Sequence, residues 1–332
     1  MAFRKRLSSR LKSETNTGFG ANSTDSAGRF YDPTNKRANV TKRGVGILER
    51  YSWYHTMLET KRSKFLFFIF VIYIVVNLVF ACIYYAIGIE HLGGVNTGSP
   101  WKNFSEVFFF STQTFTTVGY GRISPTGFAA SAVATMEAFL GLLSFAIATG
   151  LFYGRFSRPQ AFLKYSKVAL IAPYKDITAL MFRIAPFKNN NLSEAEVKLT
   201  LAMQTDDNGK MVNRFYNLDL EISKVNSMAL SWTVVHPIDE KSPLAGFSEE
   251  DIKSTRMELM VFVKAFDEVF SNTVMSRYSY INSEIVWGGK FKMMFYPSED
   301  KRQTVLDLNK LSEYEKAELP VNMPAPIEVM ES

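Results

Sequence analysis

Six consecutive residues near the middle of the chain, with the sequence TTVGYG, could replace the water around a potassium ion. An extended strand whose carbonyl groups all point to one side offers a ladder of oxygens in place of the hydration shell. Gly119 and Gly121 can adopt the positive φ angles that such a strand needs, because they have no Cβ. The Thr117 hydroxyl adds an oxygen at the inner end, and the Val118 and Tyr120 side chains can point away from the ions and pack behind the strand. We expect a potassium filter at Thr117, Val118, Gly119, Tyr120 and Gly121, with potassium bound at Thr117 to Tyr120.

One chain provides only one wall of such a filter. A ring of carbonyl oxygens needs several chains around an axis, and potassium filters use four. The motif therefore predicts a homotetramer. The alternative interpretation is a glycine-containing turn between two helices, and the flanking segments decide between the two interpretations.

The flanking segments are long and apolar. Residues 65–89 carry no charge and are numerous enough to cross about 30 Å of hydrocarbon. Residues 127–155 are rich in Ala and Gly, which allow close helix packing, and are followed by Arg155, Arg158 and Pro159. Lys and Arg outnumber Asp and Glu before the first span, so we expect a multi-pass protein of the cell membrane, such as a bacterial inner membrane, with both termini in the cytoplasm.

Between the two spans, residues 103–115 predict a helix too short to cross a bilayer. A re-entrant pore helix is tolerated at membrane depth only when protein surrounds it. Asn103 or Ser105 can cap its start, and its C-terminal end directs partial negative charge towards a central cavity. Glu137 lies inside the second span, where a carboxylate either has a functional role or is buried for packing. We expect Glu137 to hydrogen-bond the groups that support the filter.

The remaining segments differ in periodicity. Residues 46–62 place aromatic and basic residues at helical spacing, which suits a membrane-surface helix, although a helix packed on a soluble core would look similar. After residue 164 the period becomes two, as in half-buried strands, with a turn at 207–209 and a helix start at Ser248. Strands are predicted at 179–184, 197–204, 228–235, 257–263, 276–281 and 291–296. These elements favour a β-sandwich.

The predicted fold class is membrane α plus all-β: a two-span pore module with a re-entrant pore helix, followed by a cytoplasmic immunoglobulin-like β-sandwich. The predicted divisions are a flexible cytoplasmic tail (1–43), an amphipathic interfacial slide helix (44–62), a transmembrane pore domain (63–158) and a cytoplasmic β-sandwich regulatory domain (159–332). The pore domain divides into an outer helix (64–89), a pore helix (103–115), the filter (117–121) and an inner helix (127–156).

Composition argues against other classes of protein. The net charge is +6 with no nucleic-acid reader motif, so we expect no nucleic-acid partner. One cysteine, Cys82, allows no disulfide within the chain, and three scattered histidines suggest no metal site. The sequence shows no nucleophile–base pair and no phosphate-binding glycine loop, so we expect neither an enzyme nor an organic cofactor. A membrane-anchored sensor that does not conduct, and needs no tetramer, is the rival hypothesis.

Two segments of the β-rich half are similar to a known family. Residues 232–244, WTVVHPIDEKSPL, resemble the signature segment of inward rectifier potassium channels, and residues 284–288, EIVWG, resemble a second segment. The filter, the exit sequence FSRP at 156–159 and the slide helix follow the same order, so the resemblance covers roughly residues 36–310. Residues 135–139 and the compact length resemble the prokaryotic, KirBac-type branch.

The resemblance implies passive, selective potassium conduction through a tetrameric pore. Gating at the inner helix and cytoplasmic domain, independent of voltage, is implied as well. Gly141 corresponds to the bending point of the inner helix, Tyr153 to the residue that narrows the inner mouth, and loop 270–275 to a second constriction. Phe145 stands where strongly rectifying relatives carry an acid, so strong polyamine or magnesium block is not expected. The expected pore and gate residues are Gly141, Phe145, Thr149, Tyr153, Phe156 and Ser271, although the helical stripe could instead serve interhelix packing.

Two departures from the family pattern lie beside the filter. Gln113 replaces a glutamate of the pore helix, and Arg122 follows the filter where prokaryotic relatives often have an acid. The usual filter-supporting salt bridge is therefore not expected, and filter support is assigned to Gln113 and Glu137.

The resemblance also implies modulation by a phosphoinositide or another anionic lipid. Bases beside a span attract anionic headgroups by roughly 1 kcal/mol each, although positive-inside topology explains the same charges. The expected lipid contacts are Arg62, Lys64, Arg155, Arg158, Lys164 and Lys167.

Overall fold

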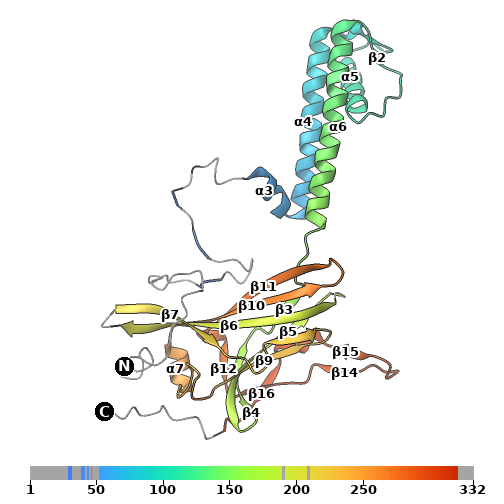
Figure 1. The fold of residues 1–332 in the computed structure, drawn as a ribbon. Coiled ribbons are helices and arrows are strands. Elements are labelled where there is room, and N and C mark those ends of the chain that lie inside the picture. The colour runs from blue at the N-terminus through green and yellow to red at the C-terminus, as the bar shows by residue number, and fades with distance from the viewer. Residues whose placement is uncertain are drawn as a thin grey trace. The chain divides into compact units, whose positions relative to one another are not determined.

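The computed structural model describes residues 29–31, 39–41, 43–44, 46, 52–188, 191–207 and 210–320. The chain divides into a helical unit, Lys42–Arg158, and a β unit that combines Met1–Thr41 with Pro159–Ser332. Figure 1 traces both units, and each is described by itself. Most of the predicted tail, and residues 47–51 of the predicted slide helix, lie outside the described residues.

Two helices of the helical unit are long and apolar enough to cross a membrane, α4 (Arg62–Ile87) and α6 (Phe128–Phe156). They run side by side in Figure 1, and the shorter α5 (Pro100–Phe115) packs against both. Helix α3 (Trp53–Glu59) packs on α6. The connections contain η1 (Ile89–His91) and the two-residue strands β1 (Leu92–Gly93) and β2 (Ser124–Pro125), which pair antiparallel.

The helix ends differ from the expected ones by a few residues, for local reasons. α5 begins at Pro100 because Ser99 caps it: the Ser99 hydroxyl accepts from the Lys102 amide, and Pro100 occupies the first helical position. Asn103, an expected cap, instead accepts from the Gly98 amide at 2.7 Å, and Ser105 lies inside the helix. α4 ends at Ile87 rather than 89 because Gly88 takes a φ of 113°.

The helical unit has a small core where its three longest helices cross. Ala81 and Tyr84 of α4, Val107 and Phe110 of α5, and Ala134 of α6 form one buried cluster. In the most apolar window of each spanning helix only 11% of the residues are buried. Most apolar side chains of these helices therefore point away from the unit, as lipid-facing or partner-facing side chains do.

The β unit consists of two five-stranded sheets that enclose one apolar core. One sheet has the order β11-β10-β6-β7, with β8 beside β6; the other has the order β12-β4-β5-β3, with β9 beside β5. The first sheet contains β6 (Leu192–Asp207), β7 (Lys210–Leu218), β8 (Lys224–Ser227), β10 (Met257–Asp267) and β11 (Asn272–Ile281). The second contains β3 (Leu163–Tyr165), β4 (Ala169–Tyr174), β5 (Ile177–Pro186), β9 (Trp232–Pro237) and β12 (Ile285–Trp287), which runs parallel to β4. Side chains from both sheets form the core, which makes the unit a β-sandwich.

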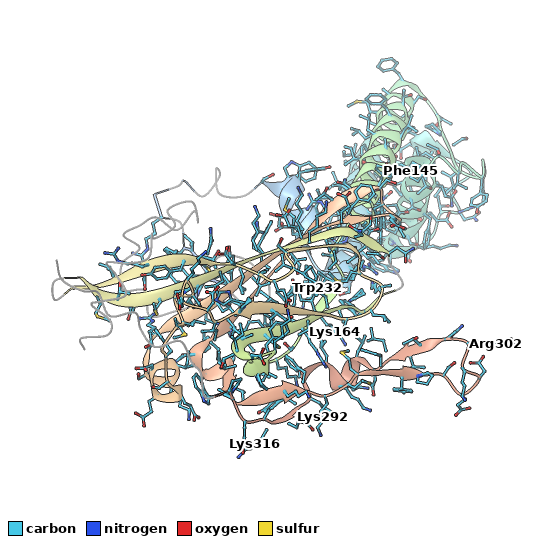
Figure 2. All side chains as sticks on the ribbon, turned by 60° about the horizontal axis from the view of Figure 1, so that its bottom comes forward. Phe145, Lys164, Trp232, Lys292, Arg302 and Lys316 are labelled. Carbon is cyan, nitrogen blue, oxygen red and sulfur yellow. The ribbon has the colours of Figure 1, made fainter. Side chains whose placement is uncertain are left out.

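Smaller elements complete the β unit. Helix α7 (Glu249–Ser254) begins with a capping box at Ser248, as predicted. The short helices are η2 (Asn282–Glu284) and η3 (Leu308–Ser312), and the outlying pairs are β13 (Gly289–Phe291) with β16 (Tyr314–Lys316) and β14 (Phe295–Pro297) with β15 (Thr304–Leu306). Figure 2 shows Arg302 at the tip of the β14–β15 hairpin.

Two predicted strands are wrong in extent. The run 291–296 is divided between β13 and β14, because β13 pairs with β16 whereas β14 pairs with β15. The run 228–235 enters β9 only at Trp232, since the Met228 amide bonds the Leu192 carbonyl of the other sheet. In the β6–β7 hairpin Asp207 pairs with Lys210, and the predicted turn residues 208–209 lie outside the described residues.

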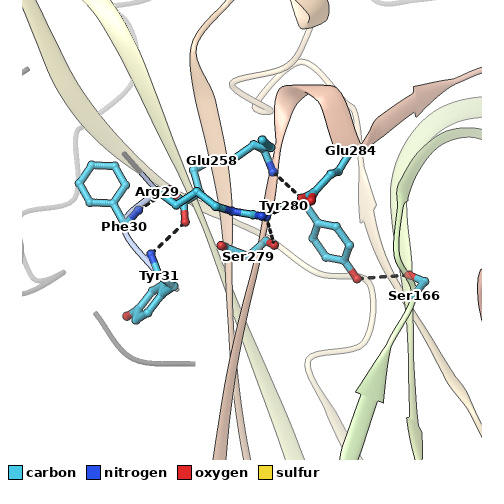
Figure 3. Close-up of polar contacts among 9 residues, drawn as sticks. Arg29, Phe30, Tyr31, Ser166, Glu258, Ser279, Tyr280 and Glu284 are labelled. Carbon is cyan, nitrogen blue, oxygen red and sulfur yellow. Dashed lines mark hydrogen bonds and ion pairs between the residues drawn. The ribbon is translucent and has the colours of Figure 1, made fainter. Parts of the chain in front are cut away.

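Residues 29–31 dock on the β6–β10–β11 sheet (Figure 3). The Arg29 guanidinium forms a bidentate pair with Glu284, at 2.5 and 3.2 Å, and also donates to the Ser279 carbonyl at 2.8 Å. The carboxylate of Glu258, in β10, accepts from the Phe30 and Tyr31 amides at 2.6 and 3.2 Å. Two glutamates therefore hold a segment more than 200 residues away in sequence.

Candidate functional site

The backbone after α5 has the positive φ angles that the glycines of the TTVGYG motif predict. Gly119 and Gly121 have φ of 54° and 81°, which confirms the predicted left-handed angles, and Thr117 also has a positive φ, 58°. A Cβ at either glycine would meet nothing within 4 Å, so conformation rather than crowding requires glycine there. Alternate residues of this strand thus share an unusual backbone geometry.

The C-terminal end of α5 holds this strand through backbone atoms. The Gln113 carbonyl accepts from the amides of Val118 and Gly119 at 3.0 and 3.3 Å, and the Thr114 carbonyl accepts from the Thr117 amide at 3.0 Å. Gln113 therefore contacts this strand through its carbonyl oxygen, an atom that the sequence prediction did not specify. The last carbonyls of any helix lack partners within that helix, and this general rule could have predicted the contact.

Two filter side chains do not pack as expected within one chain. Val118 is 53% and Tyr120 79% exposed, although packing behind the strand was predicted. Both helices that flank the filter belong to the same unit, and neither covers these side chains. One chain alone therefore leaves these side chains uncovered, and their packing behind the strand stays a prediction for an assembly of several chains.

A salt bridge joins α5 to Arg122, the residue that directly follows the filter motif. The Arg122 guanidinium pairs with the Glu106 carboxylate of α5 and also reaches the Gly94 carbonyl at 3.5 Å. Glu106 lies seven residues, or two helical turns, before Gln113 and so on the same face of α5. The pore helix therefore does carry a carboxylate, two helical turns before the position at which family members have their glutamate.

A buried polar cluster connects the three longest helices behind the filter. Glu137 of α6 is fully buried; its Oε1 lies 2.5 Å from the Ser111 hydroxyl of α5 and its Oε2 2.7 Å from the Tyr84 hydroxyl of α4. Asn77 of α4 contacts Ser111 at 3.1 Å through Oδ1. Glu137 therefore contacts the helix that carries the filter, while the side chain of Gln113 has no part in this cluster.

Gly141 lies where α6 passes the end of α5. A Cβ at this position would lie 1.9 Å from the Phe115 carbonyl oxygen, and α6 continues as a helix through it. Only glycine lets α6 pass this close to the end of α5, and this requirement is separate from any bending at Gly141.

The expected pore stripe lies on one exposed face of α6. Phe145, Thr149, Tyr153 and Phe156 are all exposed in the single chain. An apolar cavity of about 620 Å³ adjoins this face between α3, α4 and α6 and reaches Thr116, Thr117 and Phe145. Figure 2 labels Phe145 on α6. Ser271 belongs to the other unit, in the turn between β10 and β11, and has a φ of 47°.

The six basic residues near the helix ends are not equivalent. Arg155 is half-buried and donates to the carbonyls of Met57, Leu58 and Thr60 at the end of α3, with its guanidinium over the Phe65 ring. The other five, Arg62, Lys64, Arg158, Lys164 and Lys167, are exposed. Arg155 thus holds α3 against α6, whereas among the exposed bases Arg62 lies over the Phe156 ring and Lys164 over the Phe187 ring.

The segment 232–244 folds around a buried histidine. His236 Nδ1 lies 2.6 Å from the Asp219 carbonyl, so Nδ1 carries the hydrogen, and Nε2 accepts from the Ser242 hydroxyl at 2.8 Å. Burial lowers the pKa of His236. In segment 284–288, Glu284 binds Arg29 and Gly288 turns the chain with a φ of 68°. Both segments therefore act structurally in the β unit.

Metal-binding side chains do not gather in the described ranges. No group of three or more His, Cys, Asp or Glu could hold a metal ion there. The sequence predicts backbone carbonyls and the Thr117 hydroxyl as the oxygens for potassium, a set that suits a weakly bound, moving ion better than a resident one.

Comparisons with known proteins match both units. Residues 163–330 match the family described as inward rectifier potassium channel C-terminal domain, and residues 64–158 match the family described as ion channel. The inward rectifier potassium channel Kirbac3.1 of Paramagnetospirillum magnetotacticum is 36% identical over 83% of this chain and 92% of that protein.

Animal relatives match over less of their length. The inward rectifier potassium channel irk-1 of Caenorhabditis elegans is 24% identical over 72% of this chain and 47% of its own. The ATP-sensitive inward rectifier potassium channel 12 of Gallus gallus is 26% identical over 66% and 54%. The chain thus spans about half the length of these two relatives.

Proposed function

Because the chain belongs to the inward rectifier potassium channel family, we propose that four copies surround one ion path and conduct potassium passively through Thr117–Gly121. The observation that carries this proposal is the filter backbone, with positive φ at residues 117, 119 and 121 and its amides held by α5. The chain is a membrane protein of a family that performs no enzymatic reaction.

Four copies account for features that one chain leaves incomplete. One filter strand offers one wall, and its Val118 and Tyr120 side chains are exposed. Around a fourfold axis, carbonyls of Thr117 to Tyr120 from every copy form rings that replace water around the ion. Ions then move by knock-on between adjacent sites, with the C-terminal end of α5 adding partial negative charge.

The gate is proposed at the cytoplasmic end of α6. Phe145, Thr149, Tyr153 and Phe156 form an exposed stripe, and a ring of four Tyr153 side chains narrows the path enough to exclude water. Gly141 and the turn containing Ser271 are proposed to take part in gating, with the β unit biasing the inner helices. Gln113 supports the filter through its carbonyl and Glu137 through Ser111.

Anionic lipid is proposed to bind the exposed bases beside the spans. Arg62, Lys64 and Arg158 lie at the ends of α4 and α6, and Lys164 and Lys167 begin the β unit. Each contributes roughly 1 kcal/mol of attraction to an anionic surface. Arg155 acts by holding α3, so its effect on lipid binding is indirect. With both termini cytoplasmic, these bases face the inner leaflet, a topology that the excess of Lys and Arg before α4 supports.

The test is barium-sensitive rubidium uptake into liposomes that hold the purified chain and internal potassium. We expect uptake that external sodium does not suppress, from a protein that crosslinks as a tetramer in detergent. Gly119→Ala should abolish selective uptake, because its φ of 54° strains any residue with a Cβ. Gly150→Ala, on α6 with no atom within 4 Å of the added Cβ, is the matched control.

Gate and lipid sites are tested in the same assay. Tyr153→Ala should raise uptake, and titration of vesicles with anionic lipid should change uptake less in Arg158→Gln than in the wild type. Selective uptake retained by Gly119→Ala would remove the filter from the proposal. A monomer without uptake, in wild type and Tyr153→Ala alike, would favour a non-conducting sensor.

A further inference from the structure

The hydrogen-bond geometry around buried Glu137 indicates whether its carboxyl group carries a proton. Glu137 Oε1 lies 2.5 Å from Ser111 Oγ, and Oε2 lies 2.7 Å from Tyr84 Oη. Ser111 Oγ also lies 3.1 Å from Asn77 Oδ1 and 3.2 Å from the Asn77 carbonyl oxygen. Glu137, Ser111 and Asn77 are all fully buried, so no bulk water supplies a missing hydrogen.

The orientation of the Asn77 amide follows from its other neighbour. Asn77 Nδ2 lies 2.7 Å from the Tyr73 carbonyl oxygen. A backbone carbonyl only accepts hydrogen bonds, so the amide nitrogen must face Tyr73. The acceptor Oδ1 therefore faces Ser111, and reversing the amide would bring two acceptors together at 2.7 Å.

Counting hydrogens separates the two charge states of Glu137. The Ser111 hydroxyl has one hydrogen to give. If Glu137 is ionised, Ser111 must donate to its Oε1, and Asn77 Oδ1 then faces an oxygen with no hydrogen between them. If Oε1 is protonated, it donates to Ser111 Oγ, Ser111 donates to Asn77, and Tyr84 donates to Oε2. The contacts Glu137 Oε1–Ser111, Ser111–Asn77 Oδ1 and Tyr84–Oε2 are then all hydrogen bonds, and no side-chain acceptor in the cluster is left unpaired, which would be costly in a buried site.

Charge leads to the same result. Among the described residues, the partners of Glu137 are two neutral hydroxyls, and no Lys, Arg or His pairs with it. An ionised carboxylate without a partner is far more costly to bury than a neutral carboxylic acid, all the more within a membrane span. Tyr84 is the other titratable group in the cluster, and its hydroxyl hydrogen is used on Oε2.

We propose that Glu137 carries a proton at Oε1 and that the neutral chain Tyr84–Glu137–Ser111–Asn77 positions α5, and with it the filter. Glu137 is thus a positioning residue that joins α4 and α6 to α5 without bringing a charge near the ion path. The link to the filter rests on the proposed conduction, whereas the proton does not.

Infrared spectroscopy tests the proton directly. At neutral pH the full-length protein in liposomes should show the C=O stretching band of an un-ionised carboxylic acid, and Glu137→Gln should lack that band. The measurement does not depend on ion flux. Absence of the band from the wild type at neutral pH would overturn the proposal, even if every variant failed to fold.

Isosteric variants test the positioning role. In Glu137→Gln the amide donates to Ser111 and its oxygen accepts from Tyr84, as in the protonated acid. We expect barium-sensitive rubidium uptake within about twofold of the wild type, and an unchanged pH profile, because each hydrogen bond is kept. Glu137→Ala should lose about tenfold or more, since it leaves buried hydroxyls unpaired.

Glu106→Gln is the matched control. This carboxylate faces the Arg122 guanidinium, which needs a negative partner, so here the same substitution should lower uptake or selectivity. Glu137→Gln impaired as severely as Glu137→Ala would contradict a neutral Glu137. A wild type without barium-sensitive uptake would overturn the proposed conduction and leave the infrared result standing.

Discussion

The helical unit and the β unit bury their apolar side chains in different ways. The β unit encloses one core with side chains from both of its sheets, including Phe182, Leu201 and Tyr280. The helical unit has only a small cluster at its helix crossing and leaves Phe139, Phe145 and Tyr153 exposed. A single chain therefore completes the packing of one unit and not of the other.

The difference shows where each unit gets its stability. In water, burial of apolar area drives folding, and the sandwich satisfies this within one chain. In a bilayer, exposed apolar helices cost little, so the helical unit depends on backbone hydrogen bonds, close packing and a few polar contacts. Substitutions should accordingly act through cavities in the β unit and through steric fit in the helical unit.

The largest expected effect is a cavity in the sandwich. Phe182→Ala, at a fully buried position of β5, should destabilise the β unit by about 3–5 kcal/mol. Hydrogen exchange of β5 and β10 amides in the full-length protein measures the loss of protection. Phe139→Ala, on exposed α6, is the control and should leave this protection unchanged. Equal losses in both variants would contradict the contrast between the units.

The next effect tests steric fit in the helical unit. Gly141→Ala places a Cβ 1.9 Å from the Phe115 carbonyl, so α5 or α6 must shift, at a cost of about 1–3 kcal/mol. We expect potassium over sodium selectivity to fall by about tenfold, the equivalent of 1.4 kcal/mol. Gly150→Ala has the same helix propensity and no steric contact, so it should behave as the wild type. If Gly141→Ala and Gly150→Ala lost selectivity equally, a change in helix flexibility rather than a steric clash with Phe115 would explain the loss.

The smallest effect is a pH dependence confined to the β unit. The pKa of buried His236 is lowered below the unfolded value of about 6.5, so the unfolded chain binds the proton more readily. Stability is therefore full above about pH 6.5 and falls on acidification towards the folded pKa, by at most about 1.4 kcal/mol per pH unit. Hydrogen exchange of β9 amides across this range measures it, and His236→Gln should remove the dependence. A wild-type slope in that variant would assign the titration to another group.

The elements with strong local patterns could be predicted from the sequence. The two spans, the short pore helix, the capping box at Ser248 and the positive φ of Gly119 and Gly121 each follow from composition or from residues close in sequence. The strand at 291–296 failed because β13 pairs with β16, a partner more than 20 residues later. The cap of α5 failed because several polar residues compete, and only one has the required geometry.

The candidate site was predictable in its residues and not in its contacts. Sequence position singled out residues 117–121, Gln113 and Glu137 but not the atoms through which they make contact, and Gln113 does so through its carbonyl oxygen. The Arg122–Glu106 salt bridge was not predicted, although Glu106 lies two helical turns before Gln113 on the same face of α5.

The family, the two-span architecture and the glycine angles of the filter motif follow from the sequence alone, because glycine positions and apolar length act locally. The hydrogen sharing around Glu137, the need for glycine at position 141 and the contact of Arg155 with α3 became visible only in the folded chain. Such contacts depend on the distances between helices that are far apart in sequence. Those distances are set by close packing, in which a single atom more or less makes a difference.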